Sequence, residues 1–349
     1  MTSRGRPLTV AVTGPTGTFG FGLIPLLQAD ARVARVVGIA RRAFEPAEHG
    51  WTKMEYRRGD VRDPAALQQA FAGADVVVHL AFVITGVADR RAIRPINVEG
   101  TLNAFAAAAA AGARRFVYPS SVTAYGFGHD GRTALTEDSP ARPAEHLFYA
   151  QEKAEIERLL RAAAAERSVG LYVLRPPIVL GPHAVGAKRL VPERAKPLAR
   201  RLARLALRLP VRVPAPVAPL ALQFVHEEDV GEALRLCVLG SGPPGPYNVA
   251  GDGVLTAVDV AREVGLLPVR VPLAPVQAAA GLLAALPFAP PPVGWAEAVC
   301  GPAIMDTGKA RRELGWSPRY SGLEALRDTL RAQRARELSA SRTRGRSAR

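Results

Sequence analysis

The stretch VAVTGPTGTFGFGLIPLL, residues 10–27, contains the pattern that decides the fold. A short apolar run leads directly into Gly14, Gly17 and Gly20, and a mostly apolar segment follows them. Between a strand and a helix, such glycines allow a tight turn, close approach of the backbone to a pyrophosphate, and close helix–strand packing. The helix N-terminus then directs N–H groups and a positive dipole end at the phosphates. A glycine-rich turn without a ligand is the alternative, and the strand–turn–helix context favours a dinucleotide site.

Strand-like and helix-like segments alternate along the first half of the chain. The strand-like segments are LTVAVTG (8–14), RVVGIARR (35–42), MEYRRGD (54–60), DVVVHLA (75–81), RRFVYPSS (114–121) and LYVLRPPIV (171–179). Helical patterns lie between them at 17–30, 64–72, 97–112 and 147–168. Several strands are continuous Val/Ile/Leu runs, which is typical of strands covered on both faces. The alternation predicts an α/β fold with a Rossmann-type, doubly wound parallel sheet.

The composition changes after residue 181 and predicts a smaller C-terminal substrate-binding lobe built from two insertions. One insertion is basic and interrupted by prolines, the other is apolar and proline-rich, and FVHEEDVGEALRLCVLG and PYNVAG return to the main domain between them. We therefore expect a Rossmann domain from residues 1–181 and 222–250 and a lobe from residues 182–221 and 251–330.

Residues 271–296 contain no charged side chain, which raises the possibility of a membrane span. Prolines leave only residues 276–286 uninterrupted, and a helix of that length reaches about 17 Å against a hydrocarbon core of roughly 30 Å. The segment is therefore predicted to line a pocket or to be buried in the lobe.

The net charge of +15 is concentrated in two segments. Residues 188–212 hold nine Lys/Arg and one Glu, and residues 331–349 hold seven Arg and one Glu, so the rest of the chain is nearly neutral. This distribution disfavours nucleic-acid binding as the main function. The Ser/Arg-rich segment 331–349 has little apolar surface to bury and predicts a basic, disordered tail.

Cys237 and Cys300 suggest neither a disulfide framework nor a thiolate metal site, and no His/Cys/Asp cluster indicates a metal. The N-terminus runs into the first strand without the apolar region of a signal peptide, which predicts a cytoplasmic protein.

The end of the second strand indicates which dinucleotide binds. An NAD site usually has an acidic residue there, whereas GIARR (38–42) has Arg41 and Arg42. Two guanidinium groups suit a 2′-phosphate, so NADP is predicted, with NAD as the alternative cofactor. Solvated loop arginines are the other interpretation. Asp60 ends the third strand, where its carboxylate could accept a hydrogen bond from the adenine amino group.

The segment YAQEK, residues 149–153, places a tyrosine and a lysine on one face of a predicted helix. A tyrosine with an ordinary pKa of about 10 is a poor base at neutral pH, so a nearby ammonium would favour its phenolate. Four-residue spacing aligns any two side chains, so a surface pair is the alternative.

The order of ten motifs resembles the extended short-chain dehydrogenases/reductases, the NAD-dependent epimerase/dehydratase group, along nearly the whole chain. The motifs are TGPTGTFG, GDVRD, VVHLA, NVEGT, PSSVTAYG, YAQEK, RPPIVLGP, FVHEEDV, YNVAG and DTGKARRELGW. The resemblance implies that Tyr149 is the proton donor and acceptor, Lys153 its cationic partner, and Ser121 the hydroxyl that hydrogen-bonds the reacting oxygen. Asn97 resembles the position that shapes the active-site helix and its proton relay.

The resemblance also implies a set of cofactor contacts. They are Gly14, Thr16, Gly17, Thr18, Phe19, Gly20, Arg41, Arg42, Asp60, Val61, Leu80, Ala81, Asn97, Lys153, Pro176 and Ile178.

Departures from the family pattern narrow the range of reactions that we expect of this chain. Dehydratases of nucleotide sugars resemble this chain but carry an Asp–Glu pair where it has Val122 and Thr123. Nucleotide-sugar epimerases usually carry an asparagine and an arginine where it has Ile178 and Leu222. Loss of these diphosphate contacts beside an apolar lobe predicts an uncharged, fairly lipophilic substrate. His226 is interpreted as a structural residue.

These observations predict an NADP-preferring oxidoreductase that acts on a small-molecule carbonyl/alcohol pair, and the family resemblance leads us to expect a homodimer. A nucleotide-sugar epimerase and a non-catalytic NADP-binding regulator are the alternatives. The segment 197–209 predicts an amphipathic helix with leucines on one side and arginines on the other. It either covers the substrate pocket or makes peripheral contact with a membrane.

Overall fold

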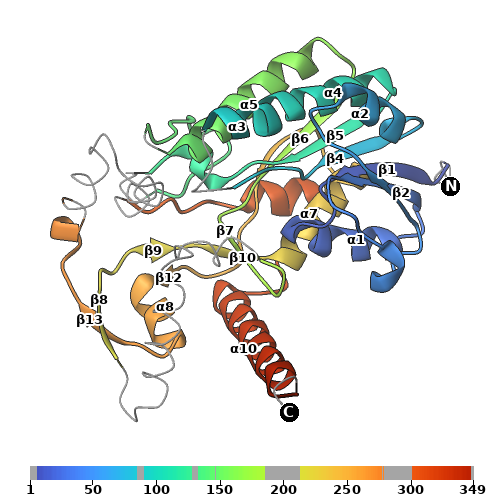
Figure 1. Cartoon of the computed structure of the whole chain (residues 1–349). Coiled ribbons are helices and arrows are strands. Elements are labelled where there is room, and N and C mark those ends of the chain that lie inside the picture. Colours follow the sequence, from blue (N-terminus) through green and yellow to red (C-terminus); the bar gives the residue numbers. More distant parts are fainter. Residues whose placement is uncertain are drawn as a thin grey trace.

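The computed structural model describes residues 6–84, 90–127, 133–145, 147–184, 213–276, 278 and 301–346. A seven-stranded sheet forms the centre of the molecule (Figure 1), and its strands follow the order β11-β6-β5-β4-β1-β2-β3. All of its neighbouring strands are parallel. The strands are β1 (Leu8–Thr13), β2 (Val33–Ala40), β3 (Met54–Arg58), β4 (Val76–His79), β5 (Arg115–Pro119), β6 (Gly170–Arg175) and β11 (Gly245–Asn248). The predicted Rossmann-type fold is confirmed, and the strand order reverses between β1 and β4, where such sheets bind ligands.

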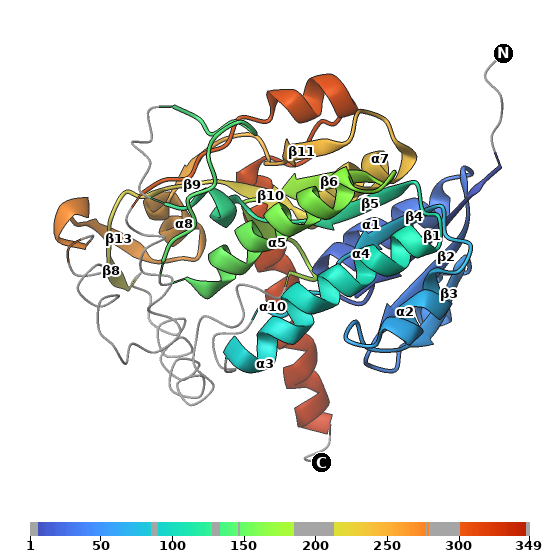
Figure 2. The same ribbon diagram turned by 90° about the horizontal axis from the view of Figure 1, so that it is seen from above.

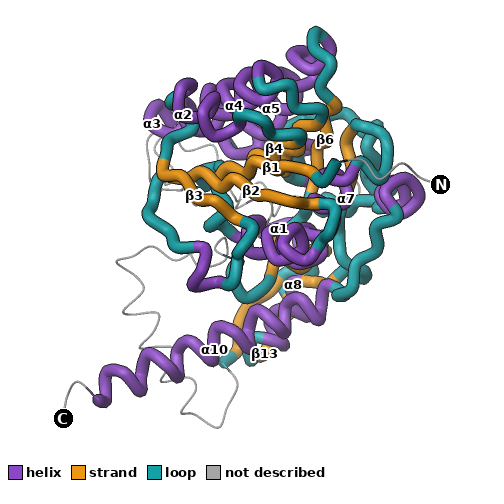
Figure 3. The backbone as a smooth tube through the Cα atoms, turned by 90° about the vertical axis from the view of Figure 1, so that its right-hand side faces the viewer, coloured by secondary structure: helices purple, strands orange, loops and turns teal. Residues whose placement is uncertain are grey.

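Helices cover both faces of the sheet (Figure 3). On one face lie α1 (Thr18–Ala29) and α7 (Glu227–Leu239), and on the other lie α2 (Pro64–Phe71), α4 (Gly100–Ala110) and α5 (Phe148–Ala165), onto which Figure 2 looks. Each face has its own core, because successive side chains of a strand point to opposite sides. Val10 and Val12 of β1 pack on the α1 side, whereas Ala11 packs on the α4 side.

The packing of α1 against α7 depends on two glycines. A Cβ atom on Gly22 would lie 2.2 Å from the carbonyl oxygen of Glu227, and one on Gly231 would lie 2.1 Å from the carbonyl oxygen of Gly22. The two backbones are therefore in direct contact, and this fixes the position of α1 relative to the rest of the domain.

Local sequence explains how α2 begins. Asp63 precedes the helix, and its carboxylate accepts hydrogen bonds from the N–H groups of Ala65 and Ala66. Pro64 occupies the first helical position, where its missing N–H costs nothing.

Short helices connect the larger elements. They are η1 (Pro46–His49), α3 (Arg90–Arg94), η2 (Pro95–Glu99), η3 (Val122–Tyr125), α8 (Ala257–Glu263) and η7 (Ala310–Leu314). Across the described ranges, every helix is too short or too polar to cross a bilayer.

Among the residues that the structure describes, three two-stranded sheets lie outside the central one. They pair β7 (Ile178–Leu180) with β10 (Phe224–His226), β9 (Ala221–Leu222) with β12 (Leu255–Thr256), and β8 (Pro214–Val217) with β13 (Leu267–Arg270). The segment LYVLRPPIV is thus divided at its two prolines between β6 and β7 rather than forming one strand. The predicted amphipathic helix 197–209 and most of the apolar segment 271–296 lie outside the described residues.

Part of the range assigned to the lobe packs on the main domain instead. Ala310, Leu314 and Trp316 belong to the same buried core as β1, α1 and α7. The indole N–H of Trp316 donates a hydrogen bond of 2.9 Å to the carbonyl oxygen of Asp229. The range 251–330, which was expected to form the lobe, therefore also contributes side chains to the core of the main domain.

The prediction of a disordered tail from residue 331 is wrong for residues 331–346, because one helix, α10 (Gly322–Arg346), runs through them and extends away from the body (Figures 1 and 3). A reciprocal cap starts it: the Glu324 N–H donates to the Ser321 hydroxyl at 3.3 Å, and the Ser321 N–H donates to the Glu324 carboxylate at 2.8 Å. The chain has no proline after Pro318 and is rich in good helix formers. Helix propensity and the cap, rather than burial, account for this helix.

Candidate active site

The glycine turn after β1 has the geometry that its sequence predicts. Gly14 has a φ of +65°, and a Cβ atom there would lie 2.9 Å from the Ala81 nitrogen. A Cβ atom on Gly20 would lie 1.8 Å from the carbonyl oxygen of Pro15, so this helix–turn contact requires glycine. Gly17 is exposed and caps α1 without a side-chain hydrogen bond, and a Cβ atom there would lie 3.5 Å from the carbonyl oxygen of Gly14, an ordinary contact distance. The turn fits a pyrophosphate held by backbone N–H groups at a helix N-terminus.

The other predicted contacts in this region surround the turn. Thr16, Thr18 and Phe19 lie in the turn and the first residues of α1, and Leu80 and Ala81 directly follow β4. The Thr18 hydroxyl donates to the carbonyl oxygen of His183 at 3.1 Å. The Ala81 N–H donates to the Thr13 hydroxyl at 3.1 Å, which ties the end of β4 to the end of β1.

Arg41 and Arg42 are exposed directly after β2. The segment that carries them is held through its backbone, because Arg58 Nε donates to the Arg41 carbonyl at 3.0 Å and the Tyr56 hydroxyl donates to the Arg42 carbonyl at 2.5 Å. Two exposed cationic side chains therefore lie on a fixed backbone at the sheet edge where the adenosine ribose of a dinucleotide is expected.

Asp60 and Val61 follow β3. The Asp60 carboxylate accepts hydrogen bonds of 3.0 and 2.8 Å from the Arg62 guanidinium and one of 2.9 Å from its backbone N–H. The Arg62 hydrogen bond holds the pKa of Asp60 below its ordinary value. The Val61 side chain is buried, and a Cβ atom on Gly100 would lie 2.6 Å from it. The backbone of Val61, rather than its side chain, is thus the part available to a ligand.

The structure brings Ser121, Tyr149 and Lys153 together at the carboxyl end of the sheet. Ser121 caps η3, where its hydroxyl accepts a 3.2 Å hydrogen bond from the Thr123 N–H, and Tyr149 and Lys153 lie in the first turns of α5. Burial raises the pKa of Tyr149, and a side-chain hydrogen bond with Ser121 offsets part of that rise. A serine and a tyrosine hydroxyl in hydrogen-bond contact can orient one substrate oxygen.

Lys153 is buried against groups that the sequence analysis did not identify. Its ammonium donates hydrogen bonds of 3.0 Å to the Tyr118 hydroxyl and 2.8 Å to the Pro119 carbonyl, and lies 3.8 Å from the centre of the Phe82 ring. Burial lowers the pKa of Lys153 to about 7, and the charges of Glu157 and Glu152 oppose this shift. The aromatic residues at 82 and 118 gave no motif signal, because only the fold places them here.

Asn97 links the segment after β4 to α5. Its side-chain oxygen accepts a 2.8 Å hydrogen bond from the Val83 N–H, and its side-chain nitrogen donates to the Val83 carbonyl at 3.1 Å and to the Glu152 carboxylate at 2.8 Å. The side chain is fully buried. These contacts order the backbone next to Phe82, and the role of Asn97 in shaping the helix and its proton relay stays a prediction.

A second buried hydrogen-bond chain leads from β1 to Asn97. The Thr13 hydroxyl lies 2.9 Å from His79 Nδ1, and His79 Nε2 lies 3.0 Å from the Thr101 hydroxyl. Thr101 donates to the Asn97 carbonyl at 2.5 Å. Burial, aided by the Lys153 charge, lowers the pKa of His79 to about 3, so this imidazole is neutral.

A buried ion pair supports α5 from below. The Arg175 guanidinium donates hydrogen bonds of 3.0 and 2.6 Å to the Glu157 carboxylate and one of 2.7 Å to the Tyr125 hydroxyl. The Tyr125 hydroxyl in turn donates to the Asn248 side-chain oxygen at 2.8 Å. This network joins η3, which follows Ser121, to the helix that carries Tyr149 and Lys153.

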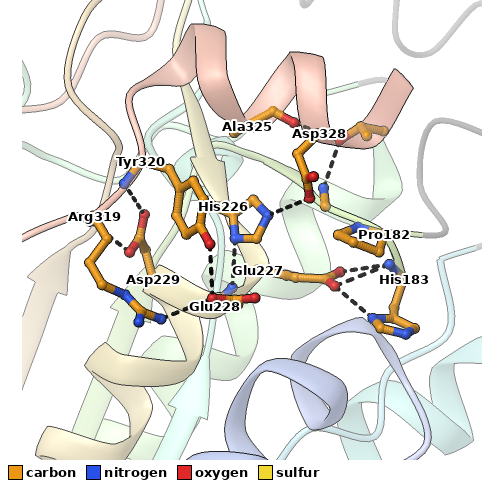
Figure 4. A network of polar contacts seen from close by, with 12 residues as sticks. Pro182, His183, His226, Glu227, Glu228, Asp229, Arg319, Tyr320, Ala325 and Asp328 are labelled. Carbon is orange, nitrogen blue, oxygen red and sulfur yellow. Dashed lines mark hydrogen bonds and ion pairs between the residues drawn. The ribbon is translucent and has the colours of Figure 1, made fainter. Parts of the chain in front are cut away.

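His226 belongs to a separate polar network at the start of α7 (Figure 4). Its Nδ1 accepts a 3.3 Å hydrogen bond from the Glu228 N–H, its Nε2 lies 3.3 Å from the Asp328 carboxylate, and its ring stacks on Tyr320 at 4.0 Å. With 1% of its surface exposed, it joins α7 to α10. Within the described ranges, no three His, Cys, Asp or Glu side chains are grouped as a metal site would require.

Ile178 and Leu222, the two departures from the expected nucleotide-sugar epimerase pattern, differ in exposure. Ile178 in β7 is 47% exposed, whereas Leu222 packs in a small core with Leu180, Phe224 and Leu326. Pro176 is buried, and its carbonyl accepts a 2.9 Å hydrogen bond from the Val122 N–H. Leu222 therefore acts in packing, and Ile178 is the departure that remains open to a ligand.

The glycine turn and the Ser–Tyr–Lys group agree with a comparison against known families. The sequence model of the NAD dependent epimerase/dehydratase family matches residues 10–250. The chain belongs to this family. An NAD-dependent epimerase/dehydratase family member uses a dinucleotide, and the glycine turn at the β1/β4 switch point fits that group.

Relatives of this epimerase/dehydratase family member include uncharacterized and enzymatic proteins. "Uncharacterized protein Rv0501" of Mycobacterium tuberculosis is 28% identical over 337 residues, which cover 94% of this chain and 84% of that protein. The 3beta-hydroxysteroid-dehydrogenase/decarboxylase isoform 1 of Arabidopsis thaliana is 29% identical over 140 residues, 40% of this chain and 31% of that protein. The UDP-glucose 4-epimerase structure from Thermotoga maritima, with UDP-glucose, has a TM-score of 0.69 at 20% identity and covers 94% of this chain and 99% of its own.

Proposed function

We propose that the protein is an NADP-preferring oxidoreductase that interconverts a ketone or aldehyde with an alcohol on an uncharged, fairly lipophilic substrate. The observation that carries this proposal is the hydrogen-bonded Ser121–Tyr149 pair with Lys153 one helical turn further along α5. The pair lies at the carboxyl edge of the sheet, which also carries the glycine turn.

NADP, when bound, supplies or accepts the hydride. The Ser121 and Tyr149 hydroxyls orient the substrate oxygen, and Tyr149 gives that oxygen a proton in reduction or takes one from it in oxidation. When Lys153 is protonated, its positive charge favours the phenolate form of Tyr149. Lys153 is buried and Tyr149 is partly buried, so little water surrounds them and these electrostatic interactions are stronger than in bulk water. General acid–base catalysis of this kind contributes about 10² to 10⁴ in rate.

The preference for NADP is supported by the charge at the sheet edge. Arg41 and Arg42 are exposed on a segment whose backbone is held by Arg58 and Tyr56. The Asp60 carboxylate, which follows β3, already accepts hydrogen bonds from Arg62. A 2′-phosphate accepts hydrogen bonds from guanidinium groups, whereas a free ribose hydroxyl pair prefers a carboxylate.

The proposed substrate class rests on the positions around the reacting group. Val122 and Thr123 offer no carboxylate to act as acid and base in an elimination. The exposed Ile178 offers an apolar contact rather than an amide. The shared fold with a UDP-glucose 4-epimerase keeps a nucleotide-sugar epimerase as the second candidate. A non-catalytic NADP-binding regulator is the third, and a sensor has no need of the Ser121–Tyr149 pair.

The test is a survey of NADPH oxidation with ketones and aldehydes of increasing apolar size, with Tyr149→Phe as the matched control. We expect turnover by the wild type and none by the variant, while both bind NADPH with similar affinity. Epimerisation of a UDP-sugar without net cofactor turnover would establish the second candidate. NADPH binding with no turnover in either assay would favour the regulator.

A further inference from the structure

Phe82 has a position that the proposed mechanism does not yet use. It is the second residue after Leu80, beyond the end of β4, and its ring is half-buried. The ring centre lies 3.8 Å from the Lys153 ammonium, and the ring meets the Tyr149 ring edge-to-face at 5.6 Å and 88°. One aromatic side chain therefore contacts both residues that are proposed to move and tune the proton.

The contact with Lys153 competes with any ligand that uses the same ammonium. A lysine ammonium has three N–H donors, and two of them go to the Tyr118 hydroxyl and the Pro119 carbonyl. The Phe82 ring covers a further side and attracts the charge through its π face. A ribose hydroxyl that bonds to Lys153 must approach where the ring now lies or displace one of the two buried acceptors.

Phe82 also stands between the two ends of the proposed dinucleotide site. Its neighbour Ala81 contacts the glycine turn, since a Cβ atom on Gly14 would lie 2.9 Å from the Ala81 nitrogen. On its other side the ring touches Tyr149 and Lys153. A cofactor with its pyrophosphate at the turn and its nicotinamide at Tyr149 must pass this side chain.

The backbone beside the ring is fixed. Asn97 binds both the N–H and the carbonyl of Val83, at 2.8 and 3.1 Å, and is itself anchored to Glu152 on α5. A rotation of the Phe82 side chain is therefore a smaller change than a movement of the segment, because it breaks no backbone hydrogen bond.

We propose that Phe82 is an aromatic gate on the nicotinamide half of the cofactor site, which occupies the Lys153–Tyr149 face and rotates aside when a dinucleotide engages Lys153. The inference rests on the proposed function, because it requires a dinucleotide at this site. The gate weakens binding of the whole cofactor and leaves binding of its adenosine half unchanged. It also ties exposure of Lys153 to the arrival of the cofactor.

The test measures binding by titration calorimetry of NADPH, NADH and adenosine 2′,5′-bisphosphate, which has the 2′-phosphate and no nicotinamide. We expect Phe82→Ala to bind the dinucleotides about tenfold more tightly, since the cation–π contact no longer competes. Its affinity for the bisphosphate should equal that of the wild type. Phe82→Leu keeps most of the packing volume and should shift the dinucleotide affinity the same way by a smaller factor. Ile84→Ala, in the same segment and 48% exposed, is the matched control and should change nothing.

Dinucleotide affinity that is unchanged or lower in both Phe82 variants would overturn the gate and leave the proposed function intact. An equal gain for the bisphosphate would also overturn it, because the effect would then not belong to the nicotinamide half. If neither wild type nor variants bound any of the three ligands, both the gate and the proposed function would fail.

Discussion

Replacing Lys153 by methionine tests whether this lysine is as buried in solution as the structure places it. Burial lowers its pKa from the ordinary 10.5 to about 7 in the folded protein. Between these values the unfolded chain binds a proton that the folded chain does not, so the free energy of unfolding of the wild type rises with pH in that window. The variant lacks this contribution, while its other titrating groups are those of the wild type.

The expected signal is a pH-dependent difference in the free energy of unfolding between the wild type and Lys153→Met. The full shift corresponds to about 5 kcal/mol, and about 2 kcal/mol of it appears between about pH 7 and pH 9. Methionine also leaves the Tyr118 hydroxyl and the Pro119 carbonyl without this donor, but that cost does not vary with pH. The pH slope therefore isolates the burial of the charge from the lost hydrogen bonds.

The measurement is urea unfolding of both proteins at several pH values in this range. The wild type should gain stability relative to Lys153→Met as the pH rises. Tyr149→Phe is the matched control from the same helix face, because burial holds the pKa of Tyr149 above its ordinary value and its stability difference should stay flat. Parallel curves for wild type and Lys153→Met would refute the buried position of the lysine.

Three further predictions test other parts of the molecule. Changing Arg41 and Arg42 to alanine should weaken NADPH by about 1–3 kcal/mol and leave NADH unchanged in calorimetry, and equal wild-type affinities for both cofactors would contradict the NADP preference. Arg175→Met removes the buried guanidinium from Glu157 and leaves that carboxylate only the partly exposed Arg161, so it should lower the free energy of unfolding by about 1.5–3 kcal/mol, measured in urea; a loss below about 1 kcal/mol would mean that water reaches the pair. Gly231→Ala places a Cβ atom 2.1 Å from the α1 backbone and should lower the melting temperature by several degrees, and an unchanged melting curve would show that α1 and α7 separate at little cost.

The sequence alone predicted the parts of this protein that depend on short stretches of chain. The glycine turn, the parallel strands and the helices of the main domain are each specified within about 20 residues, because a positive φ, an apolar run and a helical period are local properties. The Ser–Tyr–Lys group was predictable for another reason, since its residues occur in family motifs in a fixed order. The polar composition of residues 331–346 led to a wrong prediction of disorder, because helix propensity and a reciprocal cap at Ser321 and Glu324 favour a helix there.

Only the tertiary structure decided which residues surround the Ser–Tyr–Lys group. Phe82, Tyr118 and Lys153 meet because β4 and β5 end, and α5 begins, at the same edge of the sheet, although the three residues are far apart in the chain. The contact of Gly22 with Gly231 likewise joins helices separated by most of the main domain. No local pattern marks such residues, because an aromatic ring or a glycine has the same propensity wherever it packs. Their roles come from burial and from the partner that the fold brings within a few ångströms, and that is a property of the whole chain.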